Sequence, residues 1–162
     1  MRIELRTATA DATRAVGEAF AALLRPRDAV ILTGELGAGK TTLVQGVARG
    51  LDVHDQVVSP TFTLVREYRG RLDIAHVDVY RLTRIQDVMD LGLEEIGDGE
   101  AVLLVEWGDV VEEILPADHV TIELTGGESD DARRIVLSPG GQTWIERWER
   151  LEQVLSQWSL NP

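Results

Sequence analysis

The sequence predicts a three-layer α/β domain with a mixed sheet, in which antiparallel strands accompany buried parallel ones. Two short runs, AVILT at residues 29–33 and AVLLV at 101–105, are apolar throughout, as in strands that are buried on both faces. Residues 120–124 and 133–137 instead alternate in polarity on either side of a polar loop, which is typical of an antiparallel pair. Helix-linked strands and hairpins in one chain therefore favour an α/β domain whose sheet is not wholly parallel.

Length and composition predict a single domain that spans residues 1–162. Hydrophobic residues make up 44% and charged residues 27% of the chain, values close to the globular average. The absence of cysteine excludes disulfides, thiolate metal sites and cysteine catalysis. No apolar run has the roughly 20 residues of a membrane-spanning helix, and the first residues lack the apolar core of a signal peptide. We therefore expect a cytoplasmic protein that has no contact with a membrane.

The charge of −12 is concentrated in the second half of the chain. Residues 85–162 hold eighteen carboxylates and four arginines, and residues 87–131 contain no lysine or arginine. Nucleic-acid binding draws much of its affinity from Lys and Arg contacts to phosphate, so we expect that this chain does not hold nucleic acid by itself. A partner would supply the basic surface; alternatively, the acidic half is a solvated face that keeps the protein soluble.

The first third of the chain predicts an edge strand, two helices and a buried strand. Residues 2–5 form the strand and residues 11–24 a helix that ends before Pro26. The buried strand at 29–33 leads through a glycine-rich turn into a helix at 40–49, for which Gly50 is a plausible C-cap.

The rest of the chain predicts a hairpin, helical pieces and a C-terminal helix. Strands at 63–68 and 71–80 join at Gly70, whose freedom at positive φ suits a tight turn, and helical pieces fall between residues 85 and 96. The last helix opens with a capping box from Thr143 to Glu146. Its apolar stripe is expected to pack in the core rather than in a groove of a partner; it consists of Trp144, Trp148, Leu151, Leu155 and Trp158.

A phosphate-binding motif lies between the buried strand at 29–33 and the helix that follows. GELGAGKT at residues 34–41 fits the P-loop pattern G-x-x-x-x-G-K-[ST] without departure. Glycines let backbone N–H groups turn toward phosphate oxygens, and the positive end of the helix dipole points at the same charge. Lys40 can then reach the β and γ phosphates, and the Thr41 hydroxyl can join the shell of a Mg²⁺ ion. The domain is therefore predicted to be a P-loop NTPase domain.

Lys40 is also the only lysine, since the other fifteen cationic residues are arginines. A compact ammonium group on a thin stem fits between the β and γ phosphates inside a tight loop, whereas the planar fork of arginine suits bidentate contacts. The composition therefore indicates the same site as the motif.

Acidic residues near the ends of two strands are candidates for binding the metal ion and for orienting the attacking water. Glu106 directly follows AVLLV, where a Walker-B carboxylate that holds Mg²⁺ is expected. Asp78 can bind Mg²⁺ through water or orient the attacking water; the alternative is a surface carboxylate paired with Arg81. His76 shares the face of Asp78 in an alternating strand, and we expect it to be a metal-free, hydrogen-bonded structural histidine.

The segment SPTFT at residues 59–63 lies between the P-loop helix and the hairpin. Its hydroxyl groups can meet a γ-phosphate, or they can serve as an ordinary turn cap.

Four segments together resemble a known family. In order and spacing, GELGAGKTT, SPTFTLV, HVDVYRL and LLVEWGD are similar to the TsaE family (formerly YjeE), bacterial ATPases of the tRNA threonylcarbamoyladenosine pathway. The resemblance covers residues 29–108, about half of the chain. It implies a protein that binds and hydrolyses ATP with Mg²⁺ and works with TsaD and TsaB. TsaD transfers the threonylcarbamoyl group to adenosine 37 of tRNAs that read codons beginning with A, so tRNA would meet this chain only through the complex.

The resemblance also implies a set of site residues. Lys40, Asp78 and Glu106 would take part in catalysis, and Thr41 and Glu106 would bind the metal. Trp107 matches the tryptophan that follows the Walker-B acid. Family members also use the start of the first helix and the late hairpin near the nucleotide. The implied nucleotide-binding residues are Glu35, Leu36, Gly37, Ala38, Gly39, Lys40, Thr41, Thr42, Thr13 and Arg133.

Two other functions remain open at this point. Small-molecule kinases share this length and loop, but they normally place arginines over the phosphates, and residues 87–131 contain none. The nucleotide can also act as an assembly switch that is bound without being hydrolysed.

Overall fold

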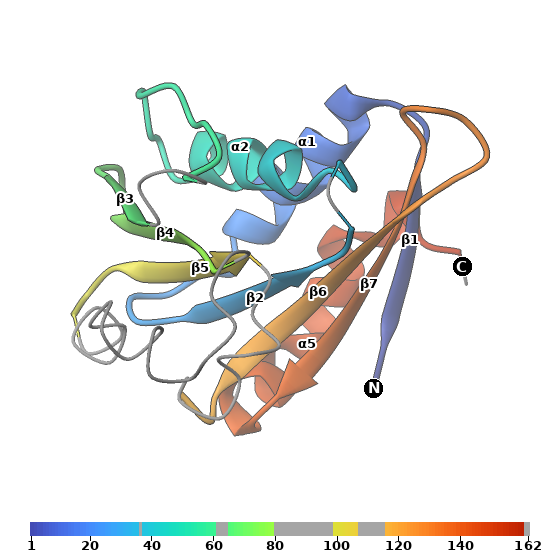
Figure 1. Ribbon diagram of the computed structural model, residues 1–162. Helices are drawn as coiled ribbons and strands as arrows, with labels where there is room; N and C mark the ends of the chain where they lie inside the picture. The colour runs from blue at the N-terminus through green and yellow to red at the C-terminus, as the bar shows by residue number, and fades with distance from the viewer. Residues whose placement is uncertain (36, 61–64, 80–98, 107–115, 161–162) are drawn as a thin grey trace.

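The computed structural model describes residues 1–35, 37–60, 65–79, 99–106 and 116–160 (Figure 1). Its strands are β1 (Ile3–Thr7), β2 (Ala29–Thr33), β3 (Val65–Tyr68), β4 (Ile74–Asp78), β5 (Val102–Glu106), β6 (His119–Gly126) and β7 (Arg133–Gly140). They form one sheet in the order β1-β7-β6-β2-β5-β4-β3. The four strands β6, β2, β5 and β4 are parallel to one another, whereas β7 pairs antiparallel with β6 and β1, and β3 pairs antiparallel with β4. The predicted mixed sheet, with residues 2–5 in an edge strand, is confirmed.

The helices of the described part pack together on one face of this sheet. They are α1 (Ala10–Ala21), α2 (Lys40–Gly50) and α5 (Gln142–Val154), followed by a short 3-10 turn (Ser156–Trp158). Phe20 of α1 stacks on Trp144 of α5 with ring centroids 5.6 Å apart, inside a core that also contains Val30 and Leu32 of β2. Ile31, between these two residues, belongs to a second buried cluster on the opposite face. Both faces of the central strands are therefore buried, as their apolar sequences predict. No helix in the described ranges is long and apolar enough to cross a membrane.

Glycines allow α1 and α2 to pack closely against each other, side by side in Figure 1. A methyl group on Gly46 would collide with the carbonyl oxygen of Arg14, and one on Gly50 would lie 2.6 Å from Cβ of Ala21. Gly50 is not the C-cap that the sequence suggested, because α2 includes it and is capped by Leu51. Its lack of a side chain serves the contact with α1 instead.

Gly70 is also needed for space rather than for a turn at positive φ. β3 and β4 are antiparallel neighbours as predicted, but Gly70 is not among the glycines with positive φ. A Cβ atom there would collide with the carbonyl oxygen of Leu51, just after α2. The hairpin connection therefore packs against the end of the P-loop helix.

The start of α5 differs from the predicted capping box. The helix begins at Gln142 after Gly141, and no side chain of its own caps it. Asp118 instead accepts a hydrogen bond from the backbone N–H of Thr143 at 3.2 Å, so the cap comes from a distant segment. The apolar stripe packs in the core as expected, with Trp144 and Leu151 completely buried. The helical pieces expected at 85–96 lie outside the described residues.

Candidate nucleotide-binding site

The P-loop connects β2 to α2 at the carboxyl end of the parallel strands. Gly34, Gly37 and Gly39 have φ of 140°, 82° and 100°, a range that residues with a Cβ atom rarely adopt. A Cβ on Gly34 would lie 2.5 Å from the carbonyl oxygen of Leu124 in β6, so this glycine is also required by a close approach. Gly39 immediately precedes α2, so the N-terminal end of this helix lies next to the loop. The backbone thus forms the cradle that the motif predicts.

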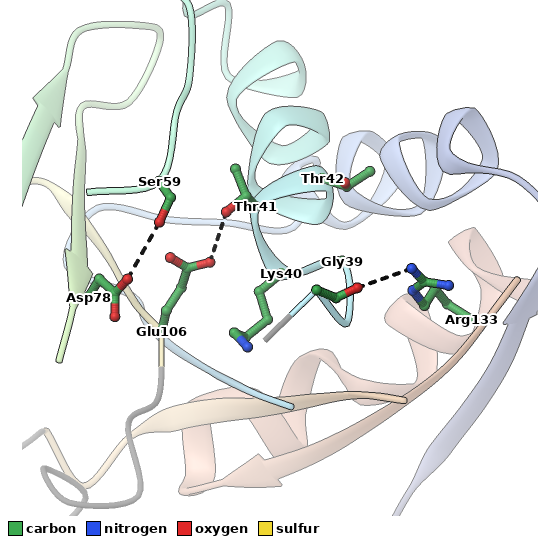
Figure 2. Close-up of a pocket in the computed structure, with 9 residues that line it drawn as sticks. Gly39, Lys40, Thr41, Thr42, Ser59, Asp78, Glu106 and Arg133 are labelled. Atoms are coloured by element: carbon green, nitrogen blue, oxygen red, sulfur yellow. Dashed lines mark hydrogen bonds between the residues drawn. The ribbon is translucent and has the colours of Figure 1, made fainter. Parts of the chain in front are cut away.

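Lys40 lies in the centre of this cradle, with Glu106 on one side and Arg133 on the other (Figure 2). Its Nζ donates hydrogen bonds to the carbonyl oxygens of Gly34 at 2.6 Å and Glu35 at 3.0 Å. Burial lowers the pKa of the Lys40 ammonium group, while the nearby carboxylates Glu106 and Asp78 oppose this shift. Any anion that enters the cavity will favour the charged form of Lys40.

Asp78 and Glu106 meet because β4 and β5 are parallel neighbours. The two residues are direct partners in the strand register and are 4% and 2% exposed. The Thr41 hydroxyl donates to Oε1 of Glu106 at 3.2 Å, and the Ser59 hydroxyl donates to Oδ2 of Asp78 at 3.4 Å. Figure 2 shows these two pairs on the same side of Lys40. Hydroxyl and carboxylate oxygens from four segments therefore converge beside the P-loop.

His76 lies beside this group and is completely buried. Its Nε2 is 3.1 Å from Oε2 of Glu106, so the two groups are in contact as an ion pair if the imidazole is protonated. Neither ring nitrogen forms a hydrogen bond within the part of the chain that the structure describes. The ring therefore faces a carboxylate of the site, and the expectation of a metal-free, hydrogen-bonded structural histidine stays a prediction.

Arg133, the first residue of β7, binds the P-loop from the opposite side. Its guanidinium donates to the carbonyl oxygens of Ala38 at 2.8 Å and Gly37 at 3.1 Å. It also donates to the carbonyl oxygens of Asp130 at 2.6 Å and Ala132 at 2.7 Å in the preceding loop. One side chain thus fixes the position of the P-loop relative to the β6–β7 connection.

Two adjacent cavities surround the loop and share Gly37 and Arg133 in their walls. The first has a volume of about 200 Å³ and is lined by Gly37, Gly39, Lys40, Thr41, Thr42, Ser59, Asp78, Glu106 and Arg133. The second, of about 750 Å³, includes Glu35 and Ala38 and extends to Glu123 and Asp130. Most of the predicted nucleotide-binding and catalytic residues are therefore brought together around one loop.

Thr13 is not brought to either cavity. It is 1% exposed inside α1, and its hydroxyl contacts the Thr7 hydroxyl at 2.7 Å. Leu36, Trp107 and Arg81 lie outside the described residues, so the expectations for them, including the Asp78–Arg81 pair, stay predictions. Ser59 lines the first cavity, although sequence reasoning left its segment undecided between a phosphate contact and a turn cap. Its position between the P-loop helix and the hairpin was the signal that pointed to it.

The donors present suit Mg²⁺ better than a softer metal. Thr41 and Glu106 offer oxygen atoms that already lie 3.2 Å from each other in the first cavity. Mg²⁺ usually takes one or two protein oxygens and completes its octahedral shell with water and phosphate oxygens. No group of three or more His, Asp or Glu residues that could hold a metal occurs among the described residues. The pair formed by Thr41 and Glu106 fits a magnesium ion that is bound together with a nucleotide.

Comparison with known proteins identifies relatives of this chain. The family model described as "Threonylcarbamoyl adenosine biosynthesis protein TsaE" matches residues 7–135. The tRNA threonylcarbamoyladenosine biosynthesis protein TsaE of Bacillus subtilis is 40% identical over 157 residues, which cover 96% of this chain and 95% of the relative. The protein of the same name from Streptomyces coelicolor is 39% identical over 138 residues, with 81% and 93% of the two chains covered.

A solved structure has the same fold. The crystal structure of YdiB from Bacillus subtilis superposes with a TM-score of 0.79 at 35% identity, and the match covers 97% of this chain and 95% of that one. The predicted P-loop fold is confirmed. Together with the sequence matches, this similarity shows that the chain belongs to the TsaE family.

Proposed function

We propose that this protein is a Mg²⁺-dependent ATPase subunit required for threonylcarbamoyladenosine modification of adenosine 37 in tRNAs that read codons beginning with A. It would act with TsaD and TsaB, and tRNA would reach it only through that complex. The single observation that best supports ATPase activity is the hydrogen bond of 3.2 Å between the Thr41 hydroxyl and Glu106. It lies in a cavity at the P-loop that Lys40 also lines. The names of the relatives support the pathway.

The P-loop would bind the phosphates of ATP. Backbone N–H groups of the loop and of the first turn of α2 would donate to phosphate oxygens. Lys40 would exchange the carbonyl oxygens of Gly34 and Glu35 for oxygens of the β and γ phosphates. This exchange would restore the pKa of Lys40 toward its usual value, because the burial that lowers it would be offset by phosphate charge.

Thr41 and Glu106 would hold the magnesium ion. Bound Mg²⁺ neutralises charge on the phosphates and orients them for in-line attack. Asp78 would either orient the attacking water or hold the metal through a water, and Ser59 fixes one oxygen of this carboxylate. In hydrolysis the water oxygen bonds to the γ phosphorus, the bond to the β–γ bridging oxygen breaks, and ADP, phosphate and a proton leave. Charge stabilisation and positioning would supply most of the rate enhancement.

The test replaces Lys40 by alanine and measures two activities. ATP hydrolysis by the purified chain should be slow, should change when TsaD and TsaB are added, and should fall about a hundredfold or more in the variant. Modification of tRNA by the reconstituted system should fall with it. Arg27→Ala, which removes an exposed positive charge at the opposite end of β2, is the matched control. Unimpaired tRNA modification by Lys40→Ala would contradict the proposal, and transfer of labelled γ-phosphate to a metabolite rather than to water would indicate a kinase.

A further inference from the structure

His76 is the fully buried polar residue that the proposed function leaves without a role. It lies in the middle of β4, two residues before Asp78, and is 0% exposed. Leaving a polar group buried without a hydrogen bond destabilises a fold, because the group has lost its contacts with water. An imidazole whose nitrogens form no hydrogen bond with the described residues therefore requires an explanation.

A neighbouring carboxylate gives that explanation. Nε2 of His76 lies 3.1 Å from Oε2 of Glu106, which is within the distance of an N–H···O hydrogen bond. The other oxygen, Oε1, is already bonded to the Thr41 hydroxyl. The two oxygens of one carboxylate thus face two different partners.

We propose that His76 is a positioning residue that holds Oε2 of Glu106 through its Nε2–H group, so that Oε1 stays directed at Thr41 and the magnesium ion. The inference rests on the proposed function, because it concerns the same metal site. Groups behind the ligands of a metal commonly orient them in this way and change metal affinity by about 10- to 100-fold.

Two physical arguments favour positioning over direct metal binding. The terminal torsion of a glutamate is broad, so an unrestrained carboxylate can turn both oxygens away from one ligand geometry. Asp78, the register partner of Glu106, adds a second negative charge that would favour such a rotation. Imidazole nitrogen, by contrast, is a poor ligand for Mg²⁺, which prefers oxygen. The role left for His76 is to donate to Glu106.

The experiment compares His76→Leu with His76→Gln. Leucine fills the space without a donor, whereas the amide nitrogen of glutamine can reach the position of Nε2. Binding of fluorescent ATP is measured in EDTA and then across a magnesium titration, with thermal unfolding measured in parallel. The Mg²⁺ concentration at half-maximal effect should rise about tenfold in His76→Leu, while the affinity in EDTA changes by less than about twofold. His76→Gln should restore most of the Mg²⁺ response.

Ile74→Val is the matched control, because Ile74 lies on the same face of β4, is equally buried and contacts the apolar core instead. An unchanged Mg²⁺ response in His76→Leu would overturn the inference, and so would a parallel loss of affinity with and without Mg²⁺. If His76→Leu does not fold, His76→Asn replaces it, since asparagine is polar but too short to reach Oε2, and the same outcomes apply. A wild-type protein whose ATP binding does not respond to Mg²⁺ would instead overturn the proposed function, and the role of His76 with it.

Discussion

At the scale of single residues, the sequence predicted the geometry of the P-loop well because the motif is local. The residues from Gly34 to Thr41 are consecutive, so the loop, its lysine and the following helix can be identified from spacing alone. Asp78 and Glu106 required one further step, namely that parallel strands end at the same edge of a sheet. The clamp from Arg133 to the carbonyl oxygens of Gly37 and Ala38 could not be predicted from spacing, because almost one hundred residues separate its two sides.

Lys40 provides a direct test of the site at this scale, because Lys40 and the N-terminus are the only amines in the chain. Burial lowers the pKa of Lys40, so more of this amine is neutral and reactive at a given pH than in an ordinary lysine. Bound ATP would both shield Lys40 and raise its pKa. With ATP and Mg²⁺ at about ten times Kd, labelling of Lys40 by an amine-specific reagent should slow about tenfold.

The N-terminal amine of the same molecule is the internal control, because Met1 is exposed and far from the loop in sequence. Peptide mapping by mass spectrometry measures both sites in one sample. Equal labelling of Lys40 with and without nucleotide would show that the P-loop does not hold ATP.

At the scale of elements, types and pairings were predicted better than the reasons for individual glycines and caps. Apolar runs and alternation depend on neighbouring residues, whereas Gly50, Gly70 and the start of α5 depend on segments that come close only in the fold. Gly70 is needed because it packs against Leu51, and the cap of α5 comes from Asp118 rather than from Thr143. Sequence spacing contains no information about these distant contacts.

The contact between α1 and α2 predicts a large effect of a very small substitution. In Gly46→Ala the new methyl group would collide with the backbone of Arg14, and backbone cannot move aside as a flexible side chain can. We expect the free energy of unfolding to fall by about 2 kcal/mol or more, despite the higher helix propensity of alanine. In Gly126→Ala no atom lies within 4 Å of the added Cβ, so the free energy of unfolding should change by less than about 0.5 kcal/mol. Urea denaturation measures the free energy of unfolding of both variants. An equal loss in Gly46→Ala and Gly126→Ala would contradict the close packing of α1 on α2.

A buried ion pair fixes α5 to the connection before β2. Arg147 donates to both oxygens of Asp28, at 2.7 and 2.8 Å, and to the carbonyl oxygen of Leu23 at 2.8 Å, and its guanidinium lies 3.9 Å from the ring centroid of Trp144. Arg147→Met should lower the free energy of unfolding by about 3–5 kcal/mol, because it leaves the Asp28 carboxylate buried without its cation. Adding Asp28→Asn should recover part of the loss, since the amide carries no charge. A loss in Arg147→Met below about 1 kcal/mol, measured by denaturant unfolding, would show that the pair is effectively solvated.

At the scale of the whole molecule, the net charge of −12 limits what the protein can bind without help. Several arginines are already committed to carboxylates or backbone, as in the contacts of Arg134 with Glu4 and of Arg133 with the P-loop. Phosphate backbones would meet mainly repulsion from the acidic second half of the chain. If the protein acts on tRNA, the affinity must come from its partners.

Binding of labelled tRNA at about 150 mM salt tests this limit, since specific and non-specific nucleic-acid affinities both depend on Lys and Arg contacts to phosphate. The chain alone should show no saturable binding up to about 10 µM, a concentration inside the range of about 1–100 µM that is typical of non-specific dissociation constants of nucleic-acid-binding proteins. With TsaD and TsaB present, the chain should join a complex that binds tRNA. Fluorescence anisotropy of the labelled chain measures its entry into the complex, and anisotropy of labelled tRNA in a separate experiment measures tRNA binding. A micromolar dissociation constant for the chain alone would mean that its few basic residues form a phosphate-binding surface, and tRNA contact would then have to be assigned to this protein itself.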